Sequence, residues 1–328
     1  MMFKYLCNRL DIECIRISGY SKGAYFDSSE VFERTDHSWN AVKIGDKWEL
    51  VDCTWGVGYV KENEFLENCG EFVKKFQPFY FFTPPQFFIY DHFSEDYQLQ
   101  PEKITLMQFK MLPKFEIFFH MFEIECISHS KVDIVTTRGL VNLKFKCPET
   151  TEMIAKLKDS HGIKYDDSVY CGRNPLTSQY EVKVSIPKTW KKFTLVLYGK
   201  YSKDTDALYK EVGKYYITFN SKEIALKKNL IRNSSALKNG FIFKPVLSDL
   251  NKRYVHQFRI YYKNATSLAL IDTNGKWIYF ERDLNDQNMW RLDFMAKTAG
   301  RIFLAVKQNQ RGDFKEMCSY NIVYEREY

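Results

Sequence analysis

The sequence lacks any cysteine spacing that would hold a zinc ion or a disulfide framework. Its eight cysteines are scattered, and no two of them form a Cys-x-x-Cys pair, which is typical of reduced thiols rather than of a disulfide-bonded secreted domain. No run of about 18 apolar residues is present, and the N-terminal residues lack the apolar stretch of a signal peptide. We therefore expect a cytoplasmic protein with no membrane partner and no metal.

Dense clusters of basic residues are also nearly absent. Lys and Arg total 48 against 41 Asp and Glu, a net charge of +7, but the basic residues are spread thinly and the densest group is Lys188, Lys191 and Lys192. A nucleic-acid-binding protein concentrates Lys and Arg on one element, with stacking aromatic side chains beside them. The charge pattern thus predicts no nucleic-acid partner, and no motif indicates a cofactor.

Apolar and aromatic residues, in contrast, are abundant. Of the 328 residues, 45% are hydrophobic and 17% aromatic, including 27 Phe and 22 Tyr. Phe and Tyr favour half-buried, pleated strands, and a chain of this length usually divides into two or three domains. The composition therefore predicts a multidomain protein rich in β structure.

One hairpin is more clearly encoded than any other element. Its strands are predicted over residues 37–44 and 47–53, with a two-residue Gly-Asp turn between them. Such a turn fixes the register, and that register places His37 diagonally across from Asp52. Diagonal neighbours on one face lie about 7 to 8 Å apart at Cα, close enough for an imidazole and a carboxylate to meet. The same face carries apolar residues such as Trp39.

His37 and Asp52 have the chemistry of two members of a cysteine-enzyme triad. A thiol nucleophile needs an imidazole to take its proton, and the imidazole needs a carboxylate to fix its tautomer. We therefore assign His37 as general base and acid, and Asp52 as the residue that orients it. Trp39 and Trp55 are candidates for a substrate cleft, although aromatic residues on a buried face are more often core residues.

The residues around this pair resemble the transglutaminase-like superfamily. Its pattern reads roughly His-x-Trp-Asn-x-Val and then Val-Asp-x-Thr-Trp-Gly, and this chain has the pattern at residues 37–42 and 51–56, with Cys53 where most relatives have Pro. The resemblance implies a papain-like core. It also implies a cysteine peptidase or a transglutaminase-like acyl transferase that acts on protein substrates.

No cysteine of the chain fits the nucleophile's place. In the superfamily the nucleophile opens the helix that precedes the hairpin, which implies a position upstream of Met1. Residues 3–10 have the apolar spacing of such a helix but no N-cap, and Cys7 falls within the apolar stripe. Strand parity points Cys53 away from Asp52. The chain as written is thus expected to be inactive.

Residues 88–96 narrow the resemblance. They read Phe-Ile-Tyr-Asp-His-Phe-Ser-Glu-Asp, which looks like the Phe-x-x-x-His-Phe-Pro-Glu-Asp junction of the kyphoscoliosis peptidase and hillarin-like family, with Ser94 in place of Pro. Members of that family are associated with muscle or cytoskeletal machinery, which implies cytoskeletal partners. His92 and His129 have no second ligand at a metal spacing, and we interpret both as structural.

The expected fold class is α+β, with a partial core followed by two β modules. The predicted organisation is a partial papain-like transglutaminase core, a connector and two immunoglobulin-like β-sandwich modules, at residues 1–95, 96–114, 115–221 and 222–328. Residues 209–217 and 314–322 share Lys-Glu, Tyr and Ile at an offset of 105 residues, and each follows an apolar strand. A repeat of about 100 residues favours two copies of one sandwich module.

Turn and periodicity signals predict the elements within these parts. We expect a helix over 62–76, no regular structure around Pro84 and Pro85, a helix over 104–112 that Pro113 stops, and a strand over 118–127. Further strands of the first module are expected over 131–136, 141–147, 180–186, 193–201 and 214–219.

Two functions remain open at this point. The first is a transglutaminase-like or kyphoscoliosis-peptidase-like enzyme, in which His37 and Asp52 serve a cysteine that lies outside this sequence. The second is a catalytically inactive cytoskeletal scaffold that binds its partners through the β-sandwich modules.

Overall fold

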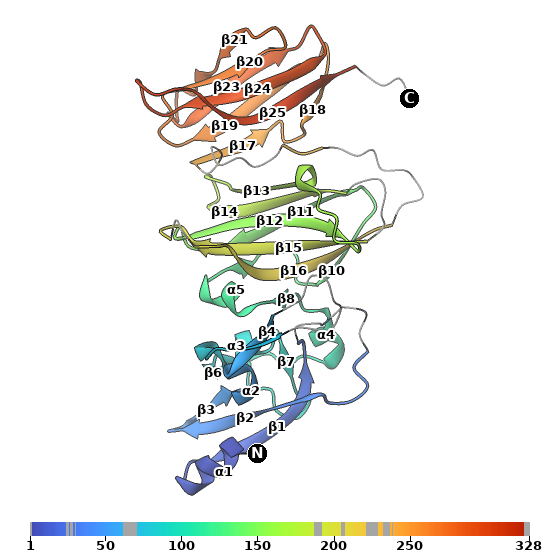
Figure 1. Cartoon of the computed structure of the whole chain (residues 1–328), viewed down its shortest axis with the longest axis vertical. Helices are drawn as coiled ribbons and strands as arrows, with labels where there is room; N and C mark the ends of the chain where they lie inside the picture. Colours follow the sequence, from blue (N-terminus) through green and yellow to red (C-terminus); the bar gives the residue numbers. More distant parts are fainter. Residues whose placement is uncertain are drawn as a thin grey trace. The chain divides into compact units, whose positions relative to one another are not determined.

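The chain forms β-sheets over most of its length. The computed structural model describes residues 2–23, 26, 29, 31–61, 71–186, 192–204, 207–220, 229–231, 237 and 239–324. Helices α1 to α5 are short, and most other elements are strands (Figure 1). The expected fold class was α+β. The structure contains both helices and strands, but it is mostly β with few helices. The chain divides into two compact units, residues 1–120 with 130–133 and residues 121–129 with 134–328.

The first unit is built on a five-stranded sheet with the strand order β6-β3-β2-β1-β7. All neighbouring strands pair antiparallel. The strands are β1 (Cys14–Ser21), β2 (His37–Ile44), β3 (Lys47–Val51), β6 (Phe81–Thr83) and β7 (His92–Phe93). The predicted hairpin is confirmed as β2 and β3, and its register is the predicted one, since Ile44 lies opposite Lys47.

The two faces of this sheet bury different side chains. One face gathers a core of Ile17, Trp39, Ala41, Leu50, Tyr80 and Phe88. The other gathers Cys7, Cys14, Val42 and Val51. Strand alternation explains the division, because consecutive residues of β2 point to opposite faces. The predicted N-terminal helix is confirmed as α1 (Met2–Arg9), but Leu6 and Leu10 of its apolar stripe remain 51% and 71% exposed.

Two local predictions in this unit are wrong. The helix expected over 62–76 is contradicted at β5 (Glu71–Lys74), which pairs antiparallel with β4 (Gly58–Lys61); residues 62–70 lie outside the described residues. Regular structure does occur at the second proline, which begins α3 (Pro85–Phe88) after the 3-10 turn Pro78–Tyr80. Proline is tolerated in the first helical turn because the N–H that it lacks has no partner there.

The segment after the sheet contains two more short helices. The helix expected over 104–112 is confirmed as α4 (Leu106–Met111), which Thr105 and Gln108 cap reciprocally. The strand expected over 118–127 is wrong, because α5 (Ile117–Met121) occupies its first part and only β9 (Glu125–Cys126) is extended. β8 (Lys114–Phe115) lies between α4 and α5.

The second unit contains four sheets, which follow the chain in two pairs (Figure 1). The first pair has the orders β10-β16-β15-β12 and β13-β14-β11-β9, and the second pair has β17-β19-β23-β22 and β18-β25-β24-β20-β21. The first pair adds β10 (Asp133–Thr136), β11 (Leu140–Lys146), β12 (Thr151–Asp159), β13 (Val169–Arg173), β14 (Gln179–Ser185), β15 (Lys192–Tyr201) and β16 (Lys210–Phe219). All five strands predicted here are present, and β12 and β13 were missed.

The second pair of sheets encloses the largest apolar core of the described residues. Its strands are β17 (Gly240–Lys244), β18 (Asp249–Asn251), β19 (Val255–Tyr262), β20 (Ser267–Ile271), β21 (Trp277–Tyr279), β22 (Glu281–Arg282), β23 (Met289–Met295), β24 (Gly300–Lys307) and β25 (Lys315–Val323).

The repeated motif lies in the last hairpin of each pair of sheets. Both hairpins have a shift in the register of their strands. The register of β15 and β16 shifts between Leu197 and Tyr198, at the level of Val212, and the register of β24 and β25 shifts between Leu304 and Ala305, at the level of Met317. Val212 and Met317 are separated by the predicted offset, and both are fully buried. A β-bulge at equivalent positions is a feature that related modules share.

Candidate functional site

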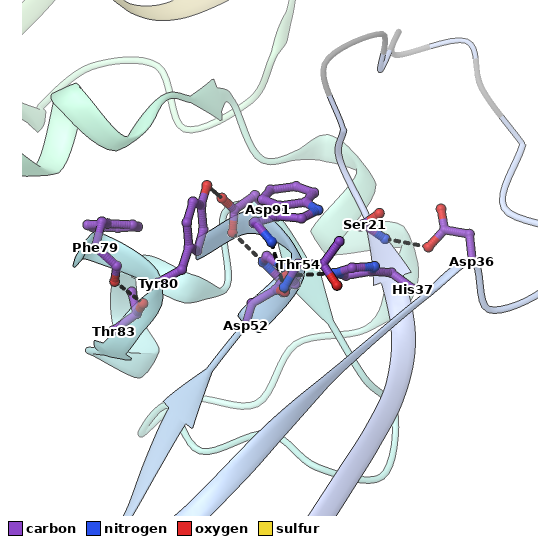
Figure 2. A network of polar contacts seen from close by, with 11 residues as sticks. Ser21, Asp36, His37, Asp52, Thr54, Phe79, Tyr80, Thr83 and Asp91 are labelled. Carbon is purple, nitrogen blue, oxygen red and sulfur yellow. Dashed lines mark hydrogen bonds and ion pairs between the residues drawn. The ribbon is translucent and has the colours of Figure 1, made fainter. Parts of the chain in front are cut away.

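Asp52 is the centre of a buried polar network in the first unit (Figure 2). It follows β3 and caps helix α2 (Cys53–Gly56), where its Oδ1 accepts hydrogen bonds from the backbone N–H groups of Thr54 (2.7 Å) and Trp55 (3.1 Å). Its Oδ2 lies 2.6 Å from His37 Nε2 and 2.9 Å from His92 Nε2. The four contacts use the full acceptor capacity of one carboxylate.

His37 meets Asp52 as the hairpin register predicts. The contact joins Nε2 of the imidazole to a carboxylate that only accepts hydrogen bonds, so Nε2 carries a proton, and in the neutral imidazole Nδ1 is the atom with the lone pair. The side chain of His37 is 14% exposed, whereas that of Asp52 is 1% exposed. The imidazole is therefore the member of the pair that a reacting group can approach.

A glycine opposite His37 makes room for this arrangement. Gly19 of β1 pairs with His37 of β2. A Cβ on Gly19 would lie 2.4 Å from the ring of Trp39 and 2.2 Å from the carbonyl oxygen of Phe93. Any larger residue would displace the indole that packs beside His37, with a ring separation of 6.1 Å.

His92 completes the network, and the sequence analysis assigned it only a structural role. It begins β7, which pairs with the end of β1 through Ser21. Its Nδ1 lies 2.7 Å from Asp91 Oδ1, and the hydroxyl of Tyr80 donates a 3.0 Å hydrogen bond to Asp91 Oδ2. The available signal was the junction motif around residue 92, which places an acid directly before the histidine.

The charged groups of this network shift one another's pKa values. Burial alone would raise the pKa of Asp52, but the hydrogen bonds and charges of His37 and His92 hold it well below its usual range. Burial alone would lower the pKa of His92, but Asp91 and Asp52 raise it to about 9. Burial and the neighbouring charge of Asp91 raise the pKa of Tyr80 well above its ordinary value. At neutral pH the interior therefore contains an ionised Asp52 beside a charged His92.

The two tryptophans proposed for a substrate cleft occupy different environments. Trp39 is 3% exposed and packs edge-on against Phe88 at a ring separation of 5.7 Å. Trp55 is partly exposed, with its ring 5.6 Å from His37 and 4.4 Å from His92. A role of either residue in substrate binding stays a prediction, and the better placed of the two is Trp55.

The thiols nearest to the hairpin in the sequence do not serve His37. Cys14 pairs with Val42, five residues along β2 from His37, or about 17 Å at the rise of a strand. Cys7 joins Cys14 on the opposite face of the sheet. Cys53 as a whole residue is exposed. Partial burial of its thiol and the charge of Asp52 nevertheless raise the pKa of that thiol, which disfavours the thiolate.

Distance alone would allow a metal ion at this site. One ligand atom each of His37, Asp52 and His92 lies within 4.8 Å of the others. However, both nitrogens of His92 contact carboxylate oxygens, so this ring has no lone pair left for a metal. Hydrogen bonds among the three side chains account for their closeness.

Comparison with known proteins identifies the relatives of the chain. Residues 106–225 match the KY-like, immunoglobulin-like domain family. Mouse kyphoscoliosis peptidase is 29% identical over 167 residues, which cover 49% of this chain and 24% of the relative. The chain is thus similar to kyphoscoliosis peptidase over about half of its length. Hillarin of Drosophila melanogaster is 28% identical, over 51% of this chain and 22% of the relative.

The resemblance to the kyphoscoliosis peptidase and hillarin-like family is thus confirmed over half of the chain. A third relative is the Lim and transglutaminase domain protein ltd-1 of Caenorhabditis elegans, which is 27% identical over 45% of this chain and 22% of its own length. The chain therefore spans about a quarter of the length of the curated relatives that it matches. Among solved structures, the Ig1-2 module of Drosophila DLAR covers 62% of this chain and 98% of its own, at 7% identity and a TM-score of 0.22.

The helices in the described part of the chain were compared with the length and hydropathy that a membrane span requires. None of the helices there is both long and apolar enough to span a bilayer.

Proposed function

We propose that the first unit is part of a transglutaminase-like core in which His37 is the general base and acid for a cysteine nucleophile, and Asp52 orients it. The observation that carries this proposal is the 2.6 Å contact between His37 Nε2 and Asp52 Oδ2. With Nε2 held, Nδ1 is the atom that can accept a thiol proton. The buried Asp52 fixes the tautomer, and the partly exposed His37 remains within reach of a substrate.

The proposed reaction is acyl transfer from a protein substrate. Nδ1 of His37 takes the proton of the thiol, the thiolate attacks a carbonyl carbon, and the imidazolium returns the proton to the departing amine. Water then hydrolyses the thioester, as in a peptidase, or an amine displaces it, as in a transglutaminase. The relatives include kyphoscoliosis peptidase and a Lim and transglutaminase domain protein, which supports this reaction class.

The nucleophile is proposed to come from residues upstream of Met1 in a longer gene product. The test is to sequence the transcript toward its 5′ end. We expect the reading frame to continue upstream through a cysteine codon at the start of the helix that α1 would extend. An in-frame stop codon that leaves Met1 as the start would overturn the enzyme proposal.

A second function, a cytoplasmic scaffold for cytoskeletal proteins, is favoured by one observation. Cys7 and Cys14 lie on the face of the sheet opposite to His37, and the raised pKa of Cys53 disfavours its thiolate, as a protein without catalysis would allow. If the reading frame starts at Met1, the whole chain should co-sediment with assembled actin filaments. A chain that remains in the supernatant under those conditions contradicts the scaffold proposal for actin.

A further inference from the structure

His92 contacts carboxylates through both of its ring nitrogens. Nδ1 lies 2.7 Å from Asp91 Oδ1, and Nε2 lies 2.9 Å from Asp52 Oδ2. An ionised carboxylate only accepts hydrogen bonds, so each ring nitrogen needs a proton to make these two contacts. With both carboxylates ionised, the geometry requires the imidazolium form of His92, which carries a positive charge.

Asp52 is not placed to carry the proton instead. It accepts two backbone N–H groups on Oδ1, and the second histidine, His37, on Oδ2. A proton on either oxygen of Asp52 would meet a donor where it needs an acceptor. At Asp91, Oδ2 already accepts the hydroxyl of Tyr80 at 3.0 Å, and a proton on Oδ1 would turn Nδ1 of His92 into an acceptor, which is the neutral alternative that the NMR experiment below distinguishes.

The surroundings of His92 keep water away from this charge. Its side chain is fully buried, and the ring of Phe88 stacks on it at 4.0 Å with an interplanar angle of 18°. The rings of Trp55 and Trp39 follow at 4.4 and 5.0 Å. Aromatic faces attract a cation, while the absence of water strengthens the attraction of the two carboxylates.

We propose that His92 is a permanently charged positioning residue, whose imidazolium keeps Asp52 ionised and aimed at His37. Asp52 then holds the proton of His37 on Nε2 and leaves Nδ1 to face the nucleophile. The use of this arrangement in catalysis rests on the proposed function, but the charge of His92 does not. The raised pKa of His92, about 9 because of Asp91 and Asp52, agrees with the geometry.

The charge can be read directly by nitrogen-15 NMR of the whole chain, which contains six histidines. The matched control is His120, whose ring stacks on Phe87 at 4.6 Å and whose pKa burial lowers to about 4. At pH 7.5 we expect two protonated ring nitrogens in His92 and one in His120. One unprotonated nitrogen in His92 at that pH would overturn the proposal.

Two variants test the positioning role. In His92→Gln we expect the Nε2–H tautomer of His37 to lose its predominance and the carboxyl pKa of Asp52 to rise by about one unit or more, because a cation has been removed. A tautomer and an Asp52 titration that match the wild type would overturn the role. If His92→Gln does not fold, Asp91→Asn keeps the side-chain volume and should release one proton from His92 below pH 7.5. A His37 tautomer that matches the wild type in Asp91→Asn, once His92 has lost that proton, would overturn the positioning role.

These experiments separate the inference from the proposed function. The NMR signals do not depend on a nucleophile, so a neutral His92 would reject the positioning role and leave the His37–Asp52 pair intact. A transcript without an upstream cysteine would reject the enzyme and leave the charge of His92 unaffected.

Discussion

The N-terminal sheet and the last pair of sheets bury different kinds of side chains. The first unit buries ionisable side chains, including Asp52, Asp91, His92 and Lys22. In the described residues from 239 to 324, Ser248 is the only buried polar or charged residue. The last pair of sheets thus shows that this chain can build a stable interior without buried charge. Buried ion pairs gain little stability over apolar packing, so stability alone does not account for the buried ion pairs of the first unit.

Lys22 shows that buried charge within the first unit also has a structural use. Its Nζ donates a 2.7 Å hydrogen bond to the carbonyl of Leu112, and Lys114 Nζ donates one of the same length to the carbonyl of Gly23. The two lysines tie the end of β1 to the segment after α4. Burial lowers the pKa of Lys22 to about 7. No carboxylate contacts its Nζ in the described residues at ion-pair distance, in contrast to His92.

The largest effect is expected from Asp52→Asn in a gene product that carries the nucleophile. The amide can present an N–H to His37 and favour the wrong tautomer, so thiol reactivity with an alkylating substrate analogue should fall by about 10³- to 10⁴-fold. The matched control is Asp36→Asn, at the exposed acid whose Oδ1 accepts from Ser21 N. Equal reactivity of Asp52→Asn and Asp36→Asn would contradict the role of Asp52.

The next effect concerns stability and compares the two interiors directly. His92→Leu removes the cation between Asp52 and Asp91, and should destabilise the first unit by about 3 to 5 kcal/mol at pH 7. Phe258→Ala in the last pair of sheets should cost about as much through the cavity that it creates. Amide hydrogen exchange of β2 and β19 reports the two effects separately. A His92→Leu variant as protected as the wild type would show that the buried charges are dispensable.

The pH dependence should separate the two regions further. The folded-state pKa of His92, about 9, exceeds its ordinary value of 6.5. Its stabilising charge is therefore fully present below pH 6.5 and is lost as the pH rises to about 9, a change of about 3 kcal/mol. The lowered pKa of Asp52 works in the opposite direction, since its stabilisation is lost as the pH falls below its ordinary value of 3.8.

In the wild type the lowered pKa of Lys22 acts in the opposite direction to that of His92, since it raises stability as the pH rises above about 7. We therefore expect the protection of β2 and β3 to fall between pH 6.5 and 9 in a Lys22→Met variant, after correction for intrinsic exchange rates. The protection of β19 and β24 should change little over the same range, because burial raises the pKa of the Cys318 thiol in their core to about 12 and that of Tyr320 well above its ordinary value. Parallel pH profiles for the two regions would argue against a charged His92.

The smallest effect should be the same in both regions. Gly45 lies in the turn after β2 with φ +59°, Gly275 lies in the turn before β21 with φ +78°, and neither has an atom within 4 Å of an added Cβ. Gly45→Ala and Gly275→Ala should each cost about 1 kcal/mol, because both changes impose a left-handed conformation on alanine. Thermal unfolding of the two variants measures these costs. A much larger cost for Gly45→Ala would mean that the turn also supports the network.

The contact between His37 and Asp52 was predictable because a two-residue turn determines the pairing of its own strands. The contact between His92 and Asp52 was not predictable, because His92 lies 40 residues further along the chain. The pairing of β7 with β1 brings it to Asp52. Nothing in the local pattern encodes that pairing. The errors at residues 71–74 and 118–127 have a similar origin, since short apolar and aromatic runs fit a helix or a strand until packing decides.

The most direct test of the central claim is to map which thiol of the longest natural gene product reacts first with iodoacetamide near neutral pH. The account predicts a cysteine upstream of Met1, with a rate that falls in His37→Gln and does not change in Cys53→Ser. Fastest labelling at Cys53, or an upstream thiol whose rate is the same in His37→Gln, would contradict the assignment of His37 as its base.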